Sequence, residues 1–546
     1  MHVTLINPPQ VFSRFQVAAG ITPPLGVAYL AGYLREHGVV PTVVDALGEA
    51  PGRVTRFRGP ALLRGLDLAQ TVAAVPAETQ LIGISNLFSF AYPAVEELMA
   101  GLKDRLPHAR VVLGGPHPGA LWARCLEDAN VDFVVSGEGE QPLLELCEHL
   151  AGSRRLDDLE AVAFRRGDEL FHVPQSRTLV RKVEDIPWPA RDLLPMENYV
   201  STQEAHGPVT SRWTSILSSR GCPYGCTFCE SRNTRWRARP AADVVDEIEH
   251  CIDRWRIRDF HFEDDNMTIS RKRILEMAAE LKRRDLEIDW QTPNGIRASV
   301  TDEATLEAMK SSGCRHITLA PESGSPRVLR DIVQKGKDFE LDQLVDVAEL
   351  AHGMGMKVAA YFILGLPGER EEDVEMTIDY ARRLARAGVD EVGFGLFIPL
   401  PGTPLWDGLG DRVDDLDLLS LLTVDDLDSS VSFNDTLDDD DLRRLRRKAY
   451  GLFFLTRLRH HPRAFLRTAR NVLESRQETK TDRVLISLVD RIRGDMNGAD
   501  RPLLAYPYDA ARTLRVLLSA ESGYAFEHGL VKTLRLALRR RRPPSA

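Results

Sequence analysis

The sequence predicts an α/β protein that contains a doubly wound parallel sheet, a partial (βα)6 barrel and a mainly helical C-terminal region. Short apolar strands alternate with helical segments over the first 150 residues, which is the pattern of a parallel sheet with helices on both faces. The same alternation resumes at residue 211 and stops near residue 405, where Arg- and Leu-rich segments follow. A chain of 546 residues is too long for one ordinary domain.

Residues 1–150 are expected to form the doubly wound sheet. Strands are expected at residues 3–7, 41–45, 81–85, 110–114 and 131–136, with a helix at residues 25–37 that begins after Pro23-Pro24 and stops at Gly38. Ligands of such sheets bind beyond the carboxyl ends of the strands. The Gly-rich and polar tips of the sequence lie there, at residues 7–9, 45–48, 85–86, 114–117 and 136–140.

Residues 151–210 are expected to connect the sheet to the barrel, through a hairpin at 161–174 and a proline-punctuated segment. Residues 211–405 are expected to form the barrel, with strands near Ile216, Phe260, Trp290, Ile317, Ala359 and Phe394. Polar or Gly-rich residues follow these strands, where a barrel carries its active site. Residues 406–546 form the C-terminal region, in which the acidic run 438–441 predicts a helix start.

Three of the seven cysteines stand in one short loop, Gly221-Cys-Pro-Tyr-Gly-Cys-Thr-Phe-Cys229. The thiolates of Cys222, Cys226 and Cys229 can bind three irons of an iron–sulfur cube, which leaves the fourth iron open. A zinc site is the alternative, but zinc usually takes paired ligands and no second pair follows. The other cysteines are scattered through apolar or helical segments and are expected to be reduced core residues.

The cysteine loop resembles that of the radical S-adenosylmethionine (radical SAM) superfamily, whose open iron binds SAM. The resemblance implies that Cys222, Cys226 and Cys229 hold a catalytic [4Fe-4S] cluster. It also implies a TIM-like barrel whose strand ends bind SAM. The implied SAM residues are Asp264 or Asp265 for the amino group, Glu322 and Arg297 for the ribose or carboxylate, and the turn Gly365-Leu366-Pro367-Gly368 for the adenine.

The N-terminal segments 23–30, 114–117 and 137–140 resemble the Rossmann-like cobalamin-binding domain of cobalamin-dependent (class B) radical SAM methyltransferases. The resemblance covers roughly residues 1–405. The cobalamin-binding residues that it implies are Pro24, Leu25, Gly26, Asp45, Ser85, Gly114, Gly115, His117, Gly137 and Glu138. The motif Asp-x-His-x-x-Gly is absent, so no histidine is expected on the cobalt. His117 lies in a different loop and is expected to structure it or to border the cofactor, with axial ligation as the alternative.

The resemblance implies methyl transfer to an unactivated carbon, or a phosphinate phosphorus, of a small-molecule biosynthetic intermediate. An external electron donor such as flavodoxin or ferredoxin is expected. Two alternatives stay open, namely a non-methylating enzyme such as an oxidative cyclase or ring-rearranging enzyme, and a cofactor-based sensor. The two kinds of enzyme differ in whether S-adenosylhomocysteine is formed.

The formal net charge of −10 argues against a nucleic-acid partner, because phosphate binding needs a basic surface. The sequence has no apolar run of the ~20 residues that a membrane span requires and does not begin like a signal peptide. We therefore expect a cytoplasmic enzyme without a membrane span. The sequence carries no signal of the oligomeric state.

Overall fold

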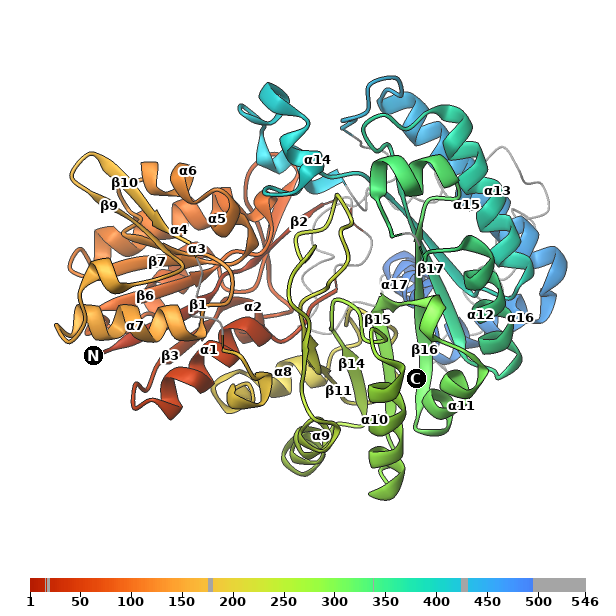
Figure 1. Cartoon of the computed structure of the whole chain (residues 1–546), viewed down its shortest axis with the longest axis horizontal. Coiled ribbons are helices and arrows are strands. Elements are labelled where there is room, and N and C mark those ends of the chain that lie inside the picture. Colours follow the sequence, from red (N-terminus) through yellow and green to blue (C-terminus); the bar gives the residue numbers. More distant parts are fainter. Residues whose placement is uncertain (15, 17–19, 175–179, 337, 424–430, 494–546) are drawn as a thin grey trace, which may run out of the picture.

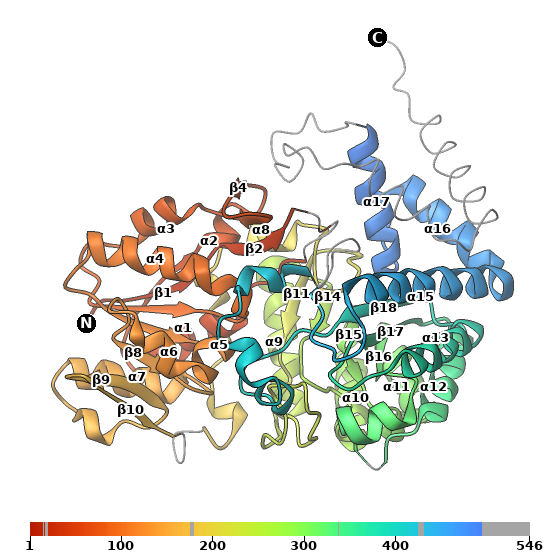
Figure 2. The same cartoon turned by 90° about the horizontal axis from the view of Figure 1, so that it is seen from above.

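The computed structural model describes residues 1–546 except 15, 17–19, 175–179, 337, 424–430 and 494–546. Two sheets lie side by side, the first mainly parallel and built from N-terminal residues, the second parallel and built from the middle of the chain (Figure 1). The helices that follow the second sheet pack on its side of the molecule (Figure 2). None of the helices described is long and apolar enough to cross a membrane.

The first sheet has seven strands in the order β10-β9-β8-β7-β6-β1-β3. Its parallel strands are β1 (Val3–Asn7), β3 (Thr42–Asp45), β6 (Leu81–Ser85), β7 (Arg110–Gly114) and β8 (Phe133–Val135). Helices α1 (Leu25–Glu36) and α7 (Glu140–Leu150) pack on one face. Helices α4 (Tyr92–Arg105) and α6 (Trp122–Glu127) pack on the other. The predicted doubly wound sheet is confirmed.

The hairpin β9 (Val162–Arg166) and β10 (Glu169–Val173) forms as predicted. It was expected in the connector, but β9 pairs antiparallel with β8 and extends the first sheet. Val162, Ala163 and Phe164 are buried there. An apolar strand beside an open sheet edge gains both ladder hydrogen bonds and burial, and it also covers the edge.

A three-stranded antiparallel sheet, which the sequence did not predict, lies beside the first sheet. It consists of β2 (Gln10–Ser13), β5 (Ala61–Arg64) and β4 (Val54–Arg56). Strands this short carry little periodicity, and β2 pairs with a strand about fifty residues away. Helices α2 (Ala46–Glu49) and α3 (Leu68–Ala74) flank this sheet in the sequence.

The second sheet has six parallel strands in the order β11-β14-β15-β16-β17-β18, with β11 and β18 as its edges. This is the predicted partial barrel. The strands are β11 (Trp213–Ile216), β14 (Asp259–Phe262), β15 (Asp289–Ile296), β16 (Cys314–Glu322), β17 (Lys357–Leu364) and β18 (Glu391–Leu396). The helices between them are α9 (Ala241–Trp255), α10 (Arg271–Arg283), α11 (Glu303–Ser311), α12 (Leu341–Gly353) and α13 (Glu371–Arg386).

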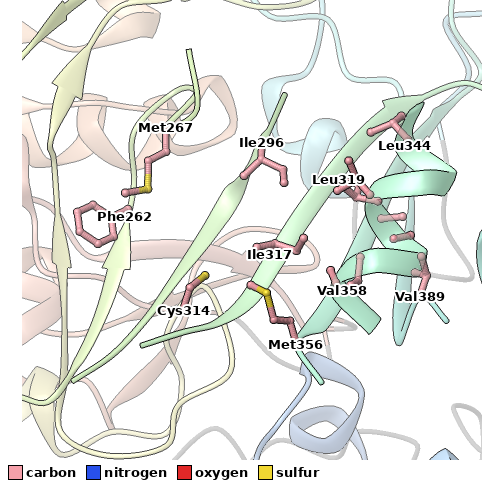
Figure 3. Close-up of a cluster of buried hydrophobic side chains, with 14 of the residues drawn as sticks. Phe262, Met267, Ile296, Cys314, Ile317, Leu319, Leu344, Met356, Val358 and Val389 are labelled. Carbon is pink, nitrogen blue, oxygen red and sulfur yellow. The ribbon is translucent and has the colours of Figure 1, made fainter. Parts of the chain in front are cut away.

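The core of the second sheet lies between the strands and these helices (Figure 3). Side chains of β17 alternate, since Phe362 and Leu364 are buried in this core whereas Tyr361 and Ile363 are only half-buried on the opposite face. The period of two is that of a strand with one face under helices. The face opposite the helices is the inner face of the barrel, and a ligand would bind there.

The C-terminal region contains α15 (Asp439–His460), α16 (Pro462–Glu474) and α17 (Lys480–Arg493). Helix α15 begins at the predicted acidic run, where the Asp438 carboxylate accepts a hydrogen bond from the backbone of Asp441 at 2.9 Å. The segment that precedes it, with α14 (Pro404–Asp407), reaches back to the first sheet. There Trp406 and Leu409 share a core with Val95 of α4. Residues 494–546 lie outside the described part.

Candidate active site

The cysteine loop leaves the end of β11 and is closed at its base by a short ladder. Strand β12 (Ser219–Arg220) pairs antiparallel with β13 (Arg237–Ala238). Inside the loop, the backbone of Cys222 donates to the Thr234 hydroxyl at 2.8 Å and accepts from the Thr234 backbone at 2.9 Å. Gly221 has φ of +83°, and a Cβ there would lie 2.5 Å from the Arg235 carbonyl oxygen. Only glycine fits at this turn.

The three thiols of the loop are half-buried, and none is in a disulfide. Burial raises the pKa of Cys222 and Cys226, and it raises the pKa of Cys229 to about 12. Metal binding would therefore displace the protons of these thiols. Among the described residues, no three His, Cys, Asp or Glu side chains are grouped around a point where one metal ion could sit. Three thiolates that each bind a different iron of a cube need not converge, and three thiols from one short loop suit a cube with one open iron.

Two of the predicted SAM residues contact the cysteine loop directly. The guanidinium of Arg297 lies 3.7 Å from the centre of the Tyr224 ring and pairs with Asp338. The Asp265 carboxylate accepts a hydrogen bond from the Ser231 hydroxyl at 2.8 Å. Residues that follow β14 and β15 are thus brought against the loop, as a strand-end site requires.

Glu322, the last residue of β16, lies on the same rim. Its carboxylate pairs with the Lys335 ammonium at 2.5 Å, and both side chains are mostly buried. Burial raises the pKa of the Cys226 thiol. The charge of Lys335 lowers this pKa and the charge of Glu322 raises it, so both side chains lie close enough to act on the thiol electrostatically. Lys335 was missed in the sequence, because it follows a π-helical turn (Val328–Val333) rather than a strand.

Asp264 and Asp265 were equal candidates for the amino group of SAM, and the structure separates them. The Asp264 carboxylate is buried and accepts hydrogen bonds from the Ser218 backbone at 2.7 Å, the Ser218 hydroxyl at 2.6 Å and the Ser219 hydroxyl. It therefore holds the strand end that leads into the cysteine loop. Asp265 is exposed beside the loop and is the candidate that a ligand can reach.

The predicted adenine turn follows β17. The backbone N–H groups of Gly365 and Leu366 donate to one carboxylate oxygen of Glu369, at 2.7 and 3.2 Å. Burial raises the pKa of Glu369 to about 8. A Cβ on Gly365 would lie 2.9 Å from Leu442 of α15. A side chain at position 365 would therefore contact α15 rather than a ligand. Pro367, which is half-buried, and Gly368, which is exposed, are the residues of the turn that a ligand can reach.

The carboxyl edge of the first sheet has features that suit a large ring. Ser85 ends β6 and Gly114 ends β7, and no atom lies within 4 Å of a Cβ built on Gly114. Beyond Ser85, the apolar side chains of Leu87 and Phe88 are 56% and 53% exposed. Both polar atoms of the Asn86 side chain are buried without a hydrogen-bond partner among the described residues. An apolar surface beside unpaired amide atoms fits a corrin ring with amide substituents.

The remaining glycines of this edge differ in the space around them. Gly115 has φ of +111°, and a Cβ there would lie 2.4 Å from the Asn86 carbonyl oxygen, so the turn requires glycine. Gly26 is exposed at the start of α1, after half-buried Pro24 and buried Leu25, and has open space around it. Gly137 is exposed after β8 with φ of +74°.

Other residues predicted to bind cobalamin are engaged in protein contacts. Asp45 is buried, and its carboxylate accepts from the Asn7 amide at 2.7 Å and the Tyr199 hydroxyl at 2.9 Å. Tyr199 belongs to α8 (Met196–Val200) in the connector, so Asp45 joins the sheet to that helix. Glu138 pairs with Arg220 and Arg237 of the β12–β13 ladder.

His117 is 2% exposed, with its Nδ1 atom 2.9 Å from the Ser89 hydroxyl and its ring 4.6 Å from that of Tyr92. Burial lowers the pKa of His117 to about 4, so the ring is neutral near pH 7. These contacts favour the expectation that His117 structures its loop.

Two family models match the chain. The model of the radical SAM superfamily matches residues 216–381, and that of the B12 binding domain matches residues 14–147. The first match covers most of the barrel, and the second covers most of the first sheet.

Named relatives cover most of the chain. The uncharacterized methyltransferase PH0819 of Pyrococcus horikoshii is 30% identical over 466 residues, which are 83% of this chain and 93% of that protein. Cytidylyl-2-hydroxyethylphosphonate methyltransferase of Streptomyces wedmorensis is 29% identical over 439 residues, 74% of this chain and 80% of that enzyme. The anaerobic magnesium-protoporphyrin IX monomethyl ester cyclase of Rubrivivax gelatinosus is 28% identical over 427 residues, 76% of this chain and 71% of that enzyme.

Among solved structures, the radical SAM methyltransferase TsrM of Kitasatospora setae, with cobalamin and a [4Fe-4S] cluster bound, matches with a TM-score of 0.60. The identity is 20%, and the match covers 75% of this chain and 78% of that one. This likeness is one of fold. Both family models, the long match to PH0819 and the cysteine loop agree: the chain belongs to the cobalamin-dependent radical SAM methyltransferases, which work with a [4Fe-4S] cluster, SAM and cobalamin.

Proposed function

We propose that this enzyme methylates an unactivated carbon, or a phosphinate phosphorus, of a small biosynthetic intermediate that binds between its two sheets. The main support for the proposal is that strand-end residues of the barrel contact the cysteine loop. In particular, the Arg297 guanidinium stacks on the Tyr224 ring. A small phosphorus-containing intermediate as the substrate is supported by the relative named cytidylyl-2-hydroxyethylphosphonate methyltransferase.

Cys222, Cys226 and Cys229 would hold the cluster, which supplies the electron that cleaves SAM, while cobalamin supplies a carrier for the methyl group. Asp265 would accept hydrogen bonds from the amino group of SAM, and Arg297 would donate to its carboxylate. Charge-assisted bonds of this kind orient a ligand strongly.

The other half of SAM would lie along the rim between β16 and β17. Glu322 would accept from the ribose hydroxyls, and the backbone of Pro367 and Gly368 would face the adenine. Lys335, paired with Glu322 at 2.5 Å, would hold that carboxylate in place.

The inner face of the barrel would contact the substrate. Tyr361 and Ile363 of β17 are half-buried there. Glu263 follows β14, and one of its carboxylate oxygens lies 3.0 Å from the Nδ1 atom of His206. The barrel interior therefore offers both apolar and hydrogen-bonding groups to a small polar molecule.

The experiment is an anaerobic assay of reconstituted enzyme with SAM labelled in its methyl group and a set of candidate substrates. Methyl transfer yields S-adenosylhomocysteine and 5′-deoxyadenosine together, and the label appears in the product. Deoxyadenosine with a changed but unlabelled product would instead identify the second candidate, an oxidative cyclase or ring-rearranging enzyme. That candidate is supported by the cyclase relatives.

The electron would come from an external protein such as flavodoxin or ferredoxin. We place the enzyme in the cytoplasm, where the reducing environment keeps the cluster thiols and the buried Cys125, Cys147, Cys251 and Cys314 reduced.

A further inference from the structure

Two arginines at the base of the cysteine loop face two glutamates at the carboxyl edge of the first sheet. Arg220 and Arg237 are partners across the β12–β13 ladder. The Arg220 guanidinium contacts Glu140 at 2.7 Å and Glu138 at 3.3 Å. Arg237 pairs with the other carboxylate oxygen of Glu138. We call these four side chains the ionic clamp.

The four side chains of the ionic clamp are mostly buried. The side chains of Arg237 and Glu140 are 6% and 5% exposed, that of Arg220 14% and that of Glu138 25%. The Arg220 guanidinium also lies 4.8 Å from the centre of the Tyr29 ring of α1. Loss of one partner leaves a poorly solvated charge, which is costly at such a site.

The position of the cysteine loop depends on the glutamates. Arg220 and Arg237 stand opposite each other on neighbouring strands, where like charges repel. Glu138 and Glu140 neutralise them, although both belong to the first sheet and its helix α7. Cys222 comes two residues after Arg220, so the ladder that the clamp stabilises is the base of the cluster loop.

We propose that the ionic clamp sets the spacing between the cysteine loop and the cobalamin-binding edge, and that its members are positioning residues for the transfer that needs both sites. The proposal rests on the proposed function, because it assigns SAM to the barrel rim and cobalamin to the first sheet. Cleavage of SAM to deoxyadenosine needs the barrel site alone. Formation of S-adenosylhomocysteine also needs an acceptor for the methyl group, and that acceptor is held by the other sheet.

The test compares these two products in reconstituted holoenzyme supplied with SAM and a chemical reductant. The variants are Glu140→Gln, which removes a charge while keeping the shape, and Arg220→Lys, which loses the forked geometry of the guanidinium. The control is Asp192→Asn, which breaks the exposed pair Arg35–Asp192 at another contact of α1. A displacement of about 1 Å can cost roughly 100-fold in rate. We therefore expect S-adenosylhomocysteine to fall roughly 10- to 100-fold in the clamp variants, with deoxyadenosine within about twofold of wild type.

A second measurement does not depend on turnover. Hydrogen–deuterium exchange of the amides in residues 219–238 should be faster in Glu140→Gln than in Asp192→Asn, because the ladder opens more often. If Glu140→Gln does not fold, Glu138→Gln, at the more exposed glutamate, replaces it. Iron and corrinoid contents are measured in every variant.

The clamp has no positioning role if both products fall equally, if neither changes, or if exchange of the loop is unchanged. If wild-type enzyme itself forms no S-adenosylhomocysteine, the proposed function fails, and the exchange experiment alone decides whether the clamp holds the loop.

Discussion

Glu322 holds a backbone conformation that residues other than glycine rarely adopt. Its φ is +64°, and the register of β16 with β17 shifts between Leu319 and Glu322. Such a conformation costs about 1–3 kcal/mol and is concentrated at functional sites. The strain turns the carboxylate toward Lys335 and the rim of the barrel, which supports its proposed role in binding SAM.

We expect Glu322→Ala to weaken SAM binding. Loss of charge-assisted hydrogen bonds worth ~1.5–3 kcal/mol should lower the affinity roughly 10- to 100-fold. The measurement is calorimetric titration of the reconstituted enzyme with SAM, alongside its iron content, which should not change. The control is Glu349→Ala, at an exposed glutamate on α12. Wild-type affinity in Glu322→Ala would remove this residue from the SAM site.

Glu369 should make stability depend on pH. Its pKa is raised to about 8 by burial, whereas an unfolded glutamate titrates near pH 4.3. The folded chain therefore keeps a proton that the unfolded chain loses, so this contribution is fully present below about pH 4.3 and is lost as the pH rises through 8. The slope is at most ~1.4 kcal/mol per pH unit.

The test is the apparent Tm of wild type and Glu369→Gln between about pH 6 and pH 9. The glutamine resembles the protonated carboxyl and can still accept from Gly365 and Leu366. The Tm of wild type should fall more steeply over this range than that of the variant. Parallel curves would mean that Glu369 titrates normally in the folded protein.

At the scale of the element, the cysteine loop is held in shape by hydrogen bonds within it and to a neighbouring turn. The β12–β13 ladder closes its base, and the backbone of Asn233 donates to the Tyr224 carbonyl at 2.8 Å. The Thr227 backbone and hydroxyl donate to the Val333 and Ile332 carbonyls, at 3.0 and 2.6 Å, across to the turn that precedes Lys335. The loop is therefore shaped by protein contacts.

Replacing Cys222, Cys226 or Cys229 singly by Ala should abolish or strongly reduce the iron content and the ~400 nm absorption of a thiolate-ligated cluster. The fold should persist, because the contacts that hold the loop are made by backbone and hydroxyl groups. The controls are Cys125→Ala and Cys147→Ala, at buried thiols of α6 and α7. Full iron content in the loop variants would overturn the cluster assignment.

At the scale of the whole molecule, the two sheets are tied together by shared buried contacts. Ala28 of α1 lies in the core cluster of the barrel, and Val328, Val333 and Leu366 lie in that of the first sheet. The segment with Trp406 packs on α4, Tyr199 of the connector binds Asp45, and the ionic clamp joins the strand ends. These ties hold the edge of the first sheet against the cysteine loop, which is the geometry that two cooperating cofactors need.

The two cofactor sites should nevertheless load independently. The full chain with Cys222, Cys226 and Cys229 all replaced by Ala should retain corrinoid in roughly the wild-type amount, because the strand ends at Ser85, Gly114 and Gly137 belong to the first sheet. The measurement is corrinoid absorption after anaerobic gel filtration. Loss of corrinoid at an unchanged Tm would show that the cluster loop forms part of that site.

The sequence by itself determined the features that depend on neighbours along the chain. The barrel strands, four to nine residues long, could be placed from the sequence because a buried strand is recognised by its own side chains. The cysteine spacing, the Gly-rich strand ends and the acidic start of α15 were visible for the same reason.

Only the tertiary structure decided which residues meet across the chain. In the folded chain Asp264 is buried whereas Asp265 is exposed, Lys335 pairs with Glu322, and Gly365 faces Leu442. The tertiary structure also added the hairpin β9–β10 to the first sheet and engaged Glu138 in the ionic clamp. Each of these depends on a contact between segments distant in sequence, and such contacts leave no local periodicity. Burial and charge pairing in the folded chain select them, because an unpaired buried charge or an open strand edge is costly.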